Sequence, residues 1–333
     1  MEKGIGNCKM NIIDMHCDTI MHFYDGEHLN GMEGTHINLE KLVQGNCLAQ
    51  CFAIFIPTNE AAEHHGITDS PEEYFDKAYA AYLREMELCK DTIRPAYKAE
   101  DILKNHEAGF ISSILTVEDG VTLRGRIENV DKFHEMGVRM VALTWNFENS
   151  LGFPQSKDPE KHMLGLKPFG IEAVLRMNEI GIAVDVSHLS EGGFWDVARH
   201  STKPFAASHS CCRSLSDVSR NLTDDQIRAI GNAGGTVGVN FATNFLRPVT
   251  DWKTDRFVSC DIVIEHLRHM MDVGGKDLPA LGSDYDGMGA EMEWRDYGGY
   301  QMLTDRIADA FGDEMAEKIC WKNALRMFND IWK

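Results

Sequence analysis

Eight short apolar runs with β-branched content alternate with longer amphipathic segments along this chain of 333 residues. The runs occupy residues 11–18, 47–57, 109–119, 138–146, 181–188, 203–210, 235–242 and 278–287. Helix-like segments lie between them at 71–90, 129–137, 170–181, 223–234 and 260–275. Several of these end in glycine just before the next run, as a helix C-cap does. Strands that alternate with helices favour parallel βαβ units, and eight strands predict a closed (β/α)8 TIM barrel.

We expect one barrel domain over residues 1–333, because no linker rich in Pro, Gly or Ser divides the chain. Barrels of this class commonly run to about 250 residues or more. The extra length is expected in loop insertions at about 58–109, 147–168 and 243–260. We expect the first insertion to contain two helices.

The formal net charge of −19 argues against nucleic acid or an anionic membrane surface as a partner. The first residues lack the apolar run and cleavage site of a signal peptide, and no stretch approaches the ~20 apolar residues of a membrane span. The nine cysteines are scattered and form no paired CxxC motif, which favours reduced thiols. We therefore expect a cytoplasmic protein that binds neither nucleic acid nor a membrane.

Ionisable residues recur at the ends of the predicted strands, where the active site of a TIM barrel lies. They are His16 and Asp18 at the end of the first run, Glu118 at the end of the third, His188 at the end of the fifth, His209 at the end of the sixth, and Asp284 and Asp286 at the end of the eighth. Each one alone has an ordinary explanation as a turn, cap or solvated residue. Together, three imidazoles and several carboxylates at one mouth are costly to bury unless a cation neutralises them. The pattern therefore predicts a metal site.

Imidazole and carboxylate ligands without cysteine suit zinc or a similar divalent ion, and manganese or cobalt accept the same ligands. A carboxylate such as Glu118 can bridge two ions. A two-metal site lowers the pKa of a bridging water, so that a hydroxide attacks a carbonyl polarised by one metal. A nearby carboxylate then moves the proton, and Asp284 is placed for that role.

The motifs "DMHCDT", "TVEDG", "DVSHLS", "ASHS…SRN" and "GSDYDG" resemble those of the membrane dipeptidase (renal dipeptidase) family, within the metal-dependent amidohydrolase superfamily. The resemblance covers nearly the whole chain in the same order, and "NALRMFNDIW" resembles the last helix of the family. It implies a (β/α)8 barrel with a binuclear zinc site that cleaves small dipeptides, with tolerance of a D-residue on the C-terminal side. It is also compatible with a homodimer.

The resemblance assigns a role to each residue of the cluster. It places His16, Asp18 and Glu118 on one zinc, and His188 and His209 on a second zinc that Glu118 bridges to the first. It makes Asp284 the general acid/base and Arg220 the group that grips the free carboxylate of the substrate, a task suited to a guanidinium fork. Without the resemblance, Arg220 would be read as a surface residue before a helix.

The chain departs from the family at the end of the fourth run. The mammalian branch has a histidine after "LT" that contacts the substrate carbonyl, and here "LTWNFEN" places Trp145 there. An indole N–H donates one hydrogen bond but cannot become a cation. We expect Trp145 to form an aromatic wall of the substrate pocket. Stabilisation of the carbonyl would then depend on the zinc pair, or on Asn146 or Asn149.

Other polar residues are expected to have structural roles. Asp14 lies one pleat below His16, so a hydrogen bond within the barrel is expected rather than ligation. Cys17 points to the opposite face and is expected to be packed. His64 and His65 fall in a hydrophilic insertion and are expected to be exposed to solvent.

The leading hypothesis is a zinc-dependent dipeptidase that uses a metal-bridged hydroxide. One alternative is another binuclear-metal amidohydrolase activity: an N-acyl amino acid hydrolase, a lactonase or a phosphoesterase. Another is a non-catalytic binding protein on the same scaffold. Arg220 favours a substrate with a free carboxylate, and Asp284 has no chemical use in a protein without catalysis.

Overall fold

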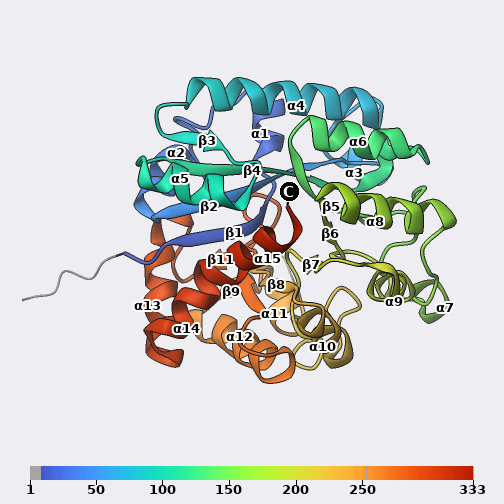
Figure 1. Ribbon diagram of the computed structural model, residues 1–333. Helices are drawn as coiled ribbons and strands as arrows, with labels where there is room; N and C mark the ends of the chain where they lie inside the picture. The colour runs from blue at the N-terminus through green and yellow to red at the C-terminus, as the bar shows by residue number, and fades with distance from the viewer. Residues whose placement is uncertain (1–8, 252–253, 333) are drawn as a thin grey trace, which may run out of the picture.

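The structure is a computed structural model that describes residues 9–251 and 254–332 (Figure 1). Cys8 and most of the stretch on which the expectation of no signal peptide rests lie outside the described residues. Within the described part, every helix is too short or too polar to cross a lipid bilayer.

Eight parallel strands close into a barrel because β2 pairs with both β1 and β4. In barrel order these strands are β1 (Ile12–Cys17), β2 (Cys47–Phe55), β4 (Ile111–Glu118), β5 (Val138–Ala142), β6 (Ala183–Asp185), β7 (Ala206–Ala207), β8 (Thr236–Val239) and β10 (Pro279–Leu281). Each coincides with one of the eight apolar runs. The predicted (β/α)8 TIM barrel is confirmed.

Helices surround this barrel, as Figure 1 shows. The larger ones are α4 (Pro71–Leu88), α6 (Ile127–Glu135), α8 (Pro168–Ile180), α9 (Glu191–His200), α10 (Asp224–Asn232), α12 (Cys260–Gly274), α13 (Tyr300–Phe311) and α15 (Asn323–Ile331). Local sequence explains their ends: α4 begins at a capping box of Ser70 and Glu73 with Pro71 in its first turn. At the end of α8, Gly181 takes a left-handed conformation (φ 89°) and leads into β6.

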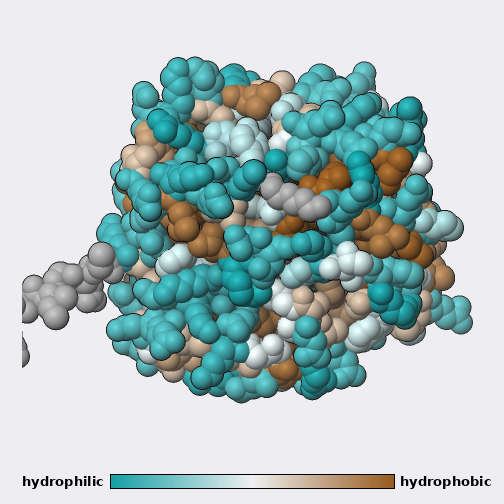
Figure 2. Space-filling view, viewed as in Figure 1, coloured by the Kyte–Doolittle hydropathy of each residue, from teal (hydrophilic) through white to brown (hydrophobic). Residues whose placement is uncertain are grey.

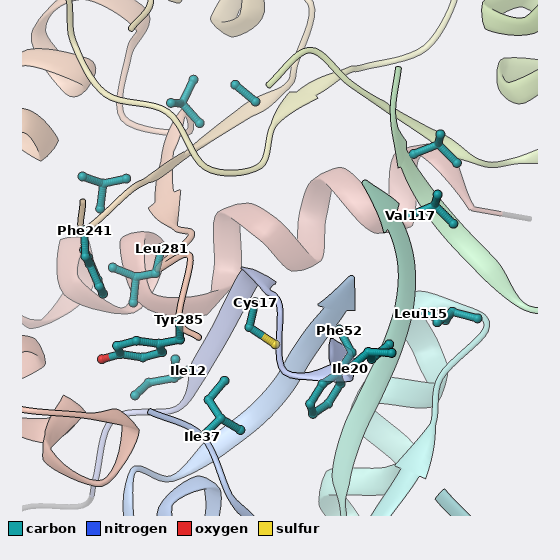
Figure 3. Packing of buried hydrophobic residues seen from close by; sticks show 14 of the residues in the cluster. Ile12, Cys17, Ile20, Ile37, Phe52, Leu115, Val117, Phe241, Leu281 and Tyr285 are labelled. Atoms are coloured by element: carbon teal, nitrogen blue, oxygen red, sulfur yellow. The ribbon is translucent and has the colours of Figure 1, made fainter. Parts of the chain in front are cut away.

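The barrel strands are buried on both faces, which is why they read as apolar runs. All six residues of β1 are buried. Cys17 packs outside the barrel lumen, in the cluster of Ile12, Ile20 and Phe52 seen in Figure 3, as expected. Asp14 is buried and accepts hydrogen bonds from the backbone N–H of Ser283 (2.9 Å), just after β10, and from the hydroxyl of Tyr300 (3.1 Å). It is hydrogen-bonded as expected, but Tyr300 belongs to the outer helix α13 rather than to the barrel.

Helix α15 covers the N-terminal end of the barrel and lies at the centre of Figure 1. The indole N–H of Trp332 donates to the carbonyl of Arg139 (3.1 Å), and the sulfur of Met327 accepts from the hydroxyl of Thr236 (3.0 Å). Both partners lie near the start of a strand. On the face of the molecule drawn in Figure 2, hydrophilic residues cover most of the surface and hydrophobic ones appear in separate groups.

The insertions contain more structure than expected. Residues 58–109 hold three helices, α3 (Glu60–His64), α4 and α5 (Ala99–Glu107), and a short strand, β3 (Ile93–Pro95), that pairs with β4. The expectation of two helices was wrong because α3 is a single short turn without apolar periodicity. Other small elements are α1 (Ile20–Tyr24), α2 (Leu39–Gln44), α7 (Pro159–His162), α11 (Thr243–Leu246), α14 (Asp313–Glu317), β9 (Phe257–Val258) and β11 (Glu291–Met292).

Candidate metal centre and active site

The barrel brings the predicted ionisable residues together at the C-terminal ends of its strands. His16 and Asp18 lie at the end of β1 and Glu118 is the last residue of β4. His188, His209 and Asp284 follow β6, β7 and β10.

One group of side chains lies on the β1 side of Glu118. The Nε2 atom of His16 is 3.6 Å from Asp18 Oδ1, 3.6 Å from Glu118 Oε2 and 3.8 Å from Asp284 Oδ1. These separations exceed hydrogen-bond length. His16 Nε2 and Asp18 Oδ1 are buried and have no hydrogen-bond partner among the described residues. Ligand atoms of His16, Asp18 and Asp284 lie within 4.8 Å of one another.

A second group faces the other oxygen of Glu118. Glu118 Oε1 lies 3.0 Å from His188 Nε2 and 3.3 Å from His209 Nε2, and the two Nε2 atoms are 3.1 Å apart. The rings of His209 and His16 stack at 3.7 Å between centroids, which joins the two groups. Glu118 therefore lies between them, with one oxygen directed to each.

The backbone is strained where it presents two of these side chains. His188 and Asp284 have positive φ angles of 65° and 63°, which non-glycine residues rarely adopt. Such strain persists when the surrounding structure holds it, and it concentrates at functional sites.

The protein's own charges shift the pKa values of the first group in different directions. Burial opposes the charge of His16, but the carboxylates of Glu118 and Asp18 outweigh it and raise the pKa of His16 well above its usual range. Burial also opposes ionisation of Glu118, yet the charge of His16 holds the pKa of Glu118 well below its usual range. Burial and the charge of Glu118 raise the pKa values of Asp18 and Asp284, although His16 counteracts part of this.

The imidazoles of the second group are held neutral. Burial and the nearby guanidinium of Arg220 lower the pKa of His188 to about 4. Burial, His16 and Arg220 lower the pKa of His209 well below its usual range. A neutral imidazole is the form that binds a metal ion.

Asparagines hold several of these side chains, and sequence reasoning identified only part of their roles. Asn240 donates to Asp284 Oδ2 (2.9 Å), a contact between the ends of β8 and β10 that no sequence pattern indicated. Asn146 Oδ1 lies 3.1 Å from Nδ1 of His188. The amide of Asn149 bonds the carbonyl of Leu143 (2.8 Å) and Asp119 Oδ1 (2.7 Å), so it is committed to the loop and does not face a substrate.

A cavity of about 570 Å³ opens over the cluster. Its walls include Trp145, whose ring packs edge-on against Phe55 at 4.8 Å between centroids. His65 is exposed, as expected, and also lines the cavity, as does Arg256, which the sequence did not single out. The cavity is large enough for a small molecule, whose central atoms would lie next to Glu118 and Asp284.

Arg220 is buried beside the cavity rather than at the surface. Its guanidinium donates to the hydroxyl of Ser210 (2.7 Å) and the carbonyl of His209 (2.8 Å), and it lies 5.6 Å from the centroid of the Phe245 ring, which lines the cavity. Its Nε has no hydrogen-bond partner among the described residues. Arg220 itself is not among the described residues that line the cavity.

Gly287 is a site residue that the sequence analysis missed. A Cβ atom at Gly287 would lie 1.8 Å from Asp18 Oδ2 and 2.8 Å from Asp284 Oδ1. Only glycine allows the loop after β10 to pass this close to the two carboxylates. Gly287 is the last residue of the motif "GSDYDG", but its contact with Asp18 could not be read from the sequence because it depends on the pairing of β1 with β10.

The donor set fits divalent metal ions. Around His16, buried imidazole and carboxylate atoms converge at separations too long for hydrogen bonds, and two of them lack other partners among the described residues. Uncompensated buried charges of this kind are costly, and a cation coordinated by these atoms would remove the cost.

Comparisons with known proteins agree with this chemistry. The model of the family described as membrane dipeptidase (peptidase family M19) matches residues 7–333. An uncharacterized protein from the pqqA 5′ region of Klebsiella pneumoniae is 33% identical over 248 residues, which cover 72% of this chain and 90% of that protein. Dipeptidase tcpJ of Claviceps purpurea is 28% identical over 305 residues, 89% of this chain and 69% of the relative.

Solved structures give the same result. A metallo peptidase from Rhodobacter sphaeroides, liganded with a phosphinate mimic of the dipeptide L-Ala-D-Ala, superposes with a TM-score of 0.87 at 28% identity, over 98% of this chain and 100% of that one. Dipeptidase AC, a metallo peptidase of family M19, superposes with a TM-score of 0.88 at 26% identity, over 98% and 99%. This chain therefore belongs to the membrane dipeptidase family, peptidase family M19, and with it to the hydrolases of peptide bonds.

Proposed function

We propose that this chain is a zinc-dependent dipeptidase with two ions in its active site. The observation that carries the proposal is the position of Glu118, whose two oxygens face two separate sets of ligand atoms. The proposed ligands are His16, Asp18 and Glu118 for one ion, and Glu118, His188 and His209 for the other. Their nitrogen and oxygen chemistry suits zinc.

The proposed substrate is a small dipeptide with a free carboxylate, including dipeptides with a D-residue at the C-terminal position. The Rhodobacter sphaeroides relative binds a mimic of L-Ala-D-Ala, and the cavity of about 570 Å³ in this chain is within the usual range for small-molecule sites. Arg220 is the proposed partner of the carboxylate: its guanidinium lies beside the cavity, behind Phe245, and its Nε–H has no hydrogen-bond partner among the described residues.

Asp284 is the proposed general acid/base. It takes a proton from the attacking water and gives it to the nitrogen of the leaving amino acid, so that a C–O bond forms while the peptide C–N bond breaks. Asn240 orients this carboxylate, and its raised pKa suits a group that carries a proton through the reaction. When bound, a pair of divalent ions lowers the pKa of water and polarises a carbonyl oxygen. Trp145 and Phe55 form an apolar wall that keeps bulk water from one side of the substrate.

The experiment is an assay of L,L- and L,D-dipeptides with metal-depleted protein, before and after zinc is restored. We expect turnover only with zinc, and a loss of turnover in Asp284→Asn at unchanged zinc content. Normal zinc content without hydrolysis of any dipeptide would overturn the proposed substrate. It would move the assignment to an N-acyl amino acid, a lactone or a phosphoester.

A further inference from the structure

A chain of buried hydrogen bonds lies on the far side of His209 from Glu118. Asp185, the last residue of β6, accepts at Oδ1 from the backbone N–H groups of Ser187 (2.9 Å) and Ser208 (2.9 Å). Its Oδ2 accepts a short hydrogen bond from the hydroxyl of Ser208. The same hydroxyl oxygen lies 2.7 Å from Nδ1 of His209. Asp185 is 2% exposed, and Ser208 and His209 are fully buried.

The direction of these bonds follows from counting protons. A hydroxyl has one proton to donate, and an ionised carboxylate has none. The proton of Ser208 is therefore directed to Asp185, and its oxygen can only accept from His209. Ser187 does not take the proton of Ser208. Its oxygen accepts from the backbone N–H of His209 (3.2 Å), and its own proton can point to Ser208 Oγ (3.4 Å).

We propose that Asp185, acting through Ser208, is a positioning residue that holds His209 in the tautomer with its proton on Nδ1. The lone pair of Nε2 is then directed at the space between Glu118 Oε1 (3.3 Å) and His188 Nε2 (3.1 Å). This inference rests on the proposed role of His209 as a metal ligand.

The alternative tautomer would block that role. With its proton on Nε2, His209 would donate to Glu118 Oε1 and fill the second metal position with an N–H group. Ligating histidines commonly have the other ring nitrogen fixed by a hydrogen-bond acceptor, which sets the tautomer and ring orientation. Here the carboxylate of Asp185 acts through the hydroxyl of Ser208. Without that carboxylate, the hydroxyl could donate its proton to Nδ1 of His209 instead.

Asp185→Asn tests the proposal with little change of shape. The amide oxygen of Asn can still accept from the backbone N–H groups of Ser187 and Ser208. Its NH2 group would donate to Ser208 Oγ, so that the hydroxyl proton of Ser208 is free to point at Nδ1 of His209. We expect the proton of His209 to move to Nε2, observed in 15N-histidine spectra of the metal-depleted protein, with His209→Gln to identify the signal. Zinc affinity at one of the two positions should fall about 10- to 100-fold.

Two further variants separate positioning from packing. Ser208→Ala removes the acceptor for Nδ1 and should also weaken zinc binding. Ser113→Ala removes another fully buried hydroxyl, which bonds Tyr82 (2.8 Å), and should leave zinc affinity unchanged.

The outcomes distinguish this inference from the proposed function. If His209 keeps its proton on Nδ1 in Asp185→Asn and zinc affinity is native, the positioning role is wrong. If the tautomer moves as expected but even the native protein takes up no zinc, the positioning role is supported and the proposed metal centre fails.

Discussion

Glu118 has a different set of neighbours at each of its carboxylate oxygens. Oε2 faces His16 at 3.6 Å, and Oε1 faces His188 and His209 at 3.0 and 3.3 Å. The meeting of these residues could be predicted from the sequence, because each lies at the end of an apolar run. It could not predict the close approach of Gly287 or the bond from Asn240, which depend on how the loops after β8 and β10 fold against β1.

Gly287→Ala should damage the site without a change of any charged group. Its Cβ would overlap Asp18 Oδ2 at 1.8 Å and displace the carboxylate. Because displacements of about 1 Å can cost about 100-fold in rate, we expect a loss of that order in kcat/KM and weaker zinc binding.

Gly289→Ala is the matched control in the same loop, since its Cβ would approach only the flexible end of Arg256, at 3.4 Å. Equal effects of the two substitutions would contradict the account of Gly287.

Arg220→Ala should separate a dipeptidase from the alternative hydrolases. Loss of a charged hydrogen bond of about 1.5–3 kcal/mol should raise KM for dipeptides with a free carboxylate about 10- to 100-fold. The KM of C-terminally amidated substrates should change little. Steady-state kinetics of both substrate classes provide the measurement. A selective rise in Arg256→Ala instead would assign the carboxylate to Arg256, which lines the cavity.

At the scale of elements, the site depends on loops that follow short strands. β7 contains only two residues and β6 only three. The loops that follow them nevertheless place His209 and His188 in the candidate metal centre. The eight barrel strands were predictable because burial on both faces leaves an apolar run in each. β3, β9 and β11 were not, since each is partly exposed and none of them lies in a long apolar run.

Asn149 should be essential to the loop after β5. Besides donating to Leu143 and Asp119, its side-chain oxygen accepts from the backbone N–H groups of Leu151 (2.8 Å) and Gly152 (3.3 Å). Its loss leaves several buried groups unpaired, so Asn149→Ala should reduce the free energy of unfolding by about 3 kcal/mol, measured by urea denaturation.

Asn129→Ala removes a single bond, to the carbonyl of Leu123 (3.1 Å), and should cost about 1 kcal/mol. If the two variants lose the same stability, the role assigned to the Asn149 loop is wrong.

At the scale of the whole molecule, the two ends of the closed barrel have different roles. α15 packs against the N-terminal end, and the buried charges gather at the other. The family resemblance of the sequence motifs is confirmed over the chain. The single-domain organisation, the cytoplasmic location and the homodimer stay predictions, because they depend on surfaces and surroundings that motif residues do not describe.

Metal removal should destabilise the whole barrel, because the proposed ligands come from four of its strands, β1, β4, β6 and β7. Zinc at 100 times its dissociation constant should add about 2.7 kcal/mol for one site to the free energy of unfolding, seen as a rise in Tm.

Glu118→Gln should lose most of this gain. Glu85→Gln, at a buried carboxylate that accepts from the backbone N–H of Leu29 (2.9 Å), should keep it. A zinc-induced rise of equal size in both variants would argue against Glu118 as a ligand.

The most direct test of the central claim is anomalous diffraction from crystals of the zinc-loaded protein. We expect two zinc peaks for each chain, one beside His16 and Asp18 and one beside His188 and His209, with Glu118 in contact with both. A single peak, or peaks away from Glu118, would contradict the two-ion centre from which the proposed function is argued.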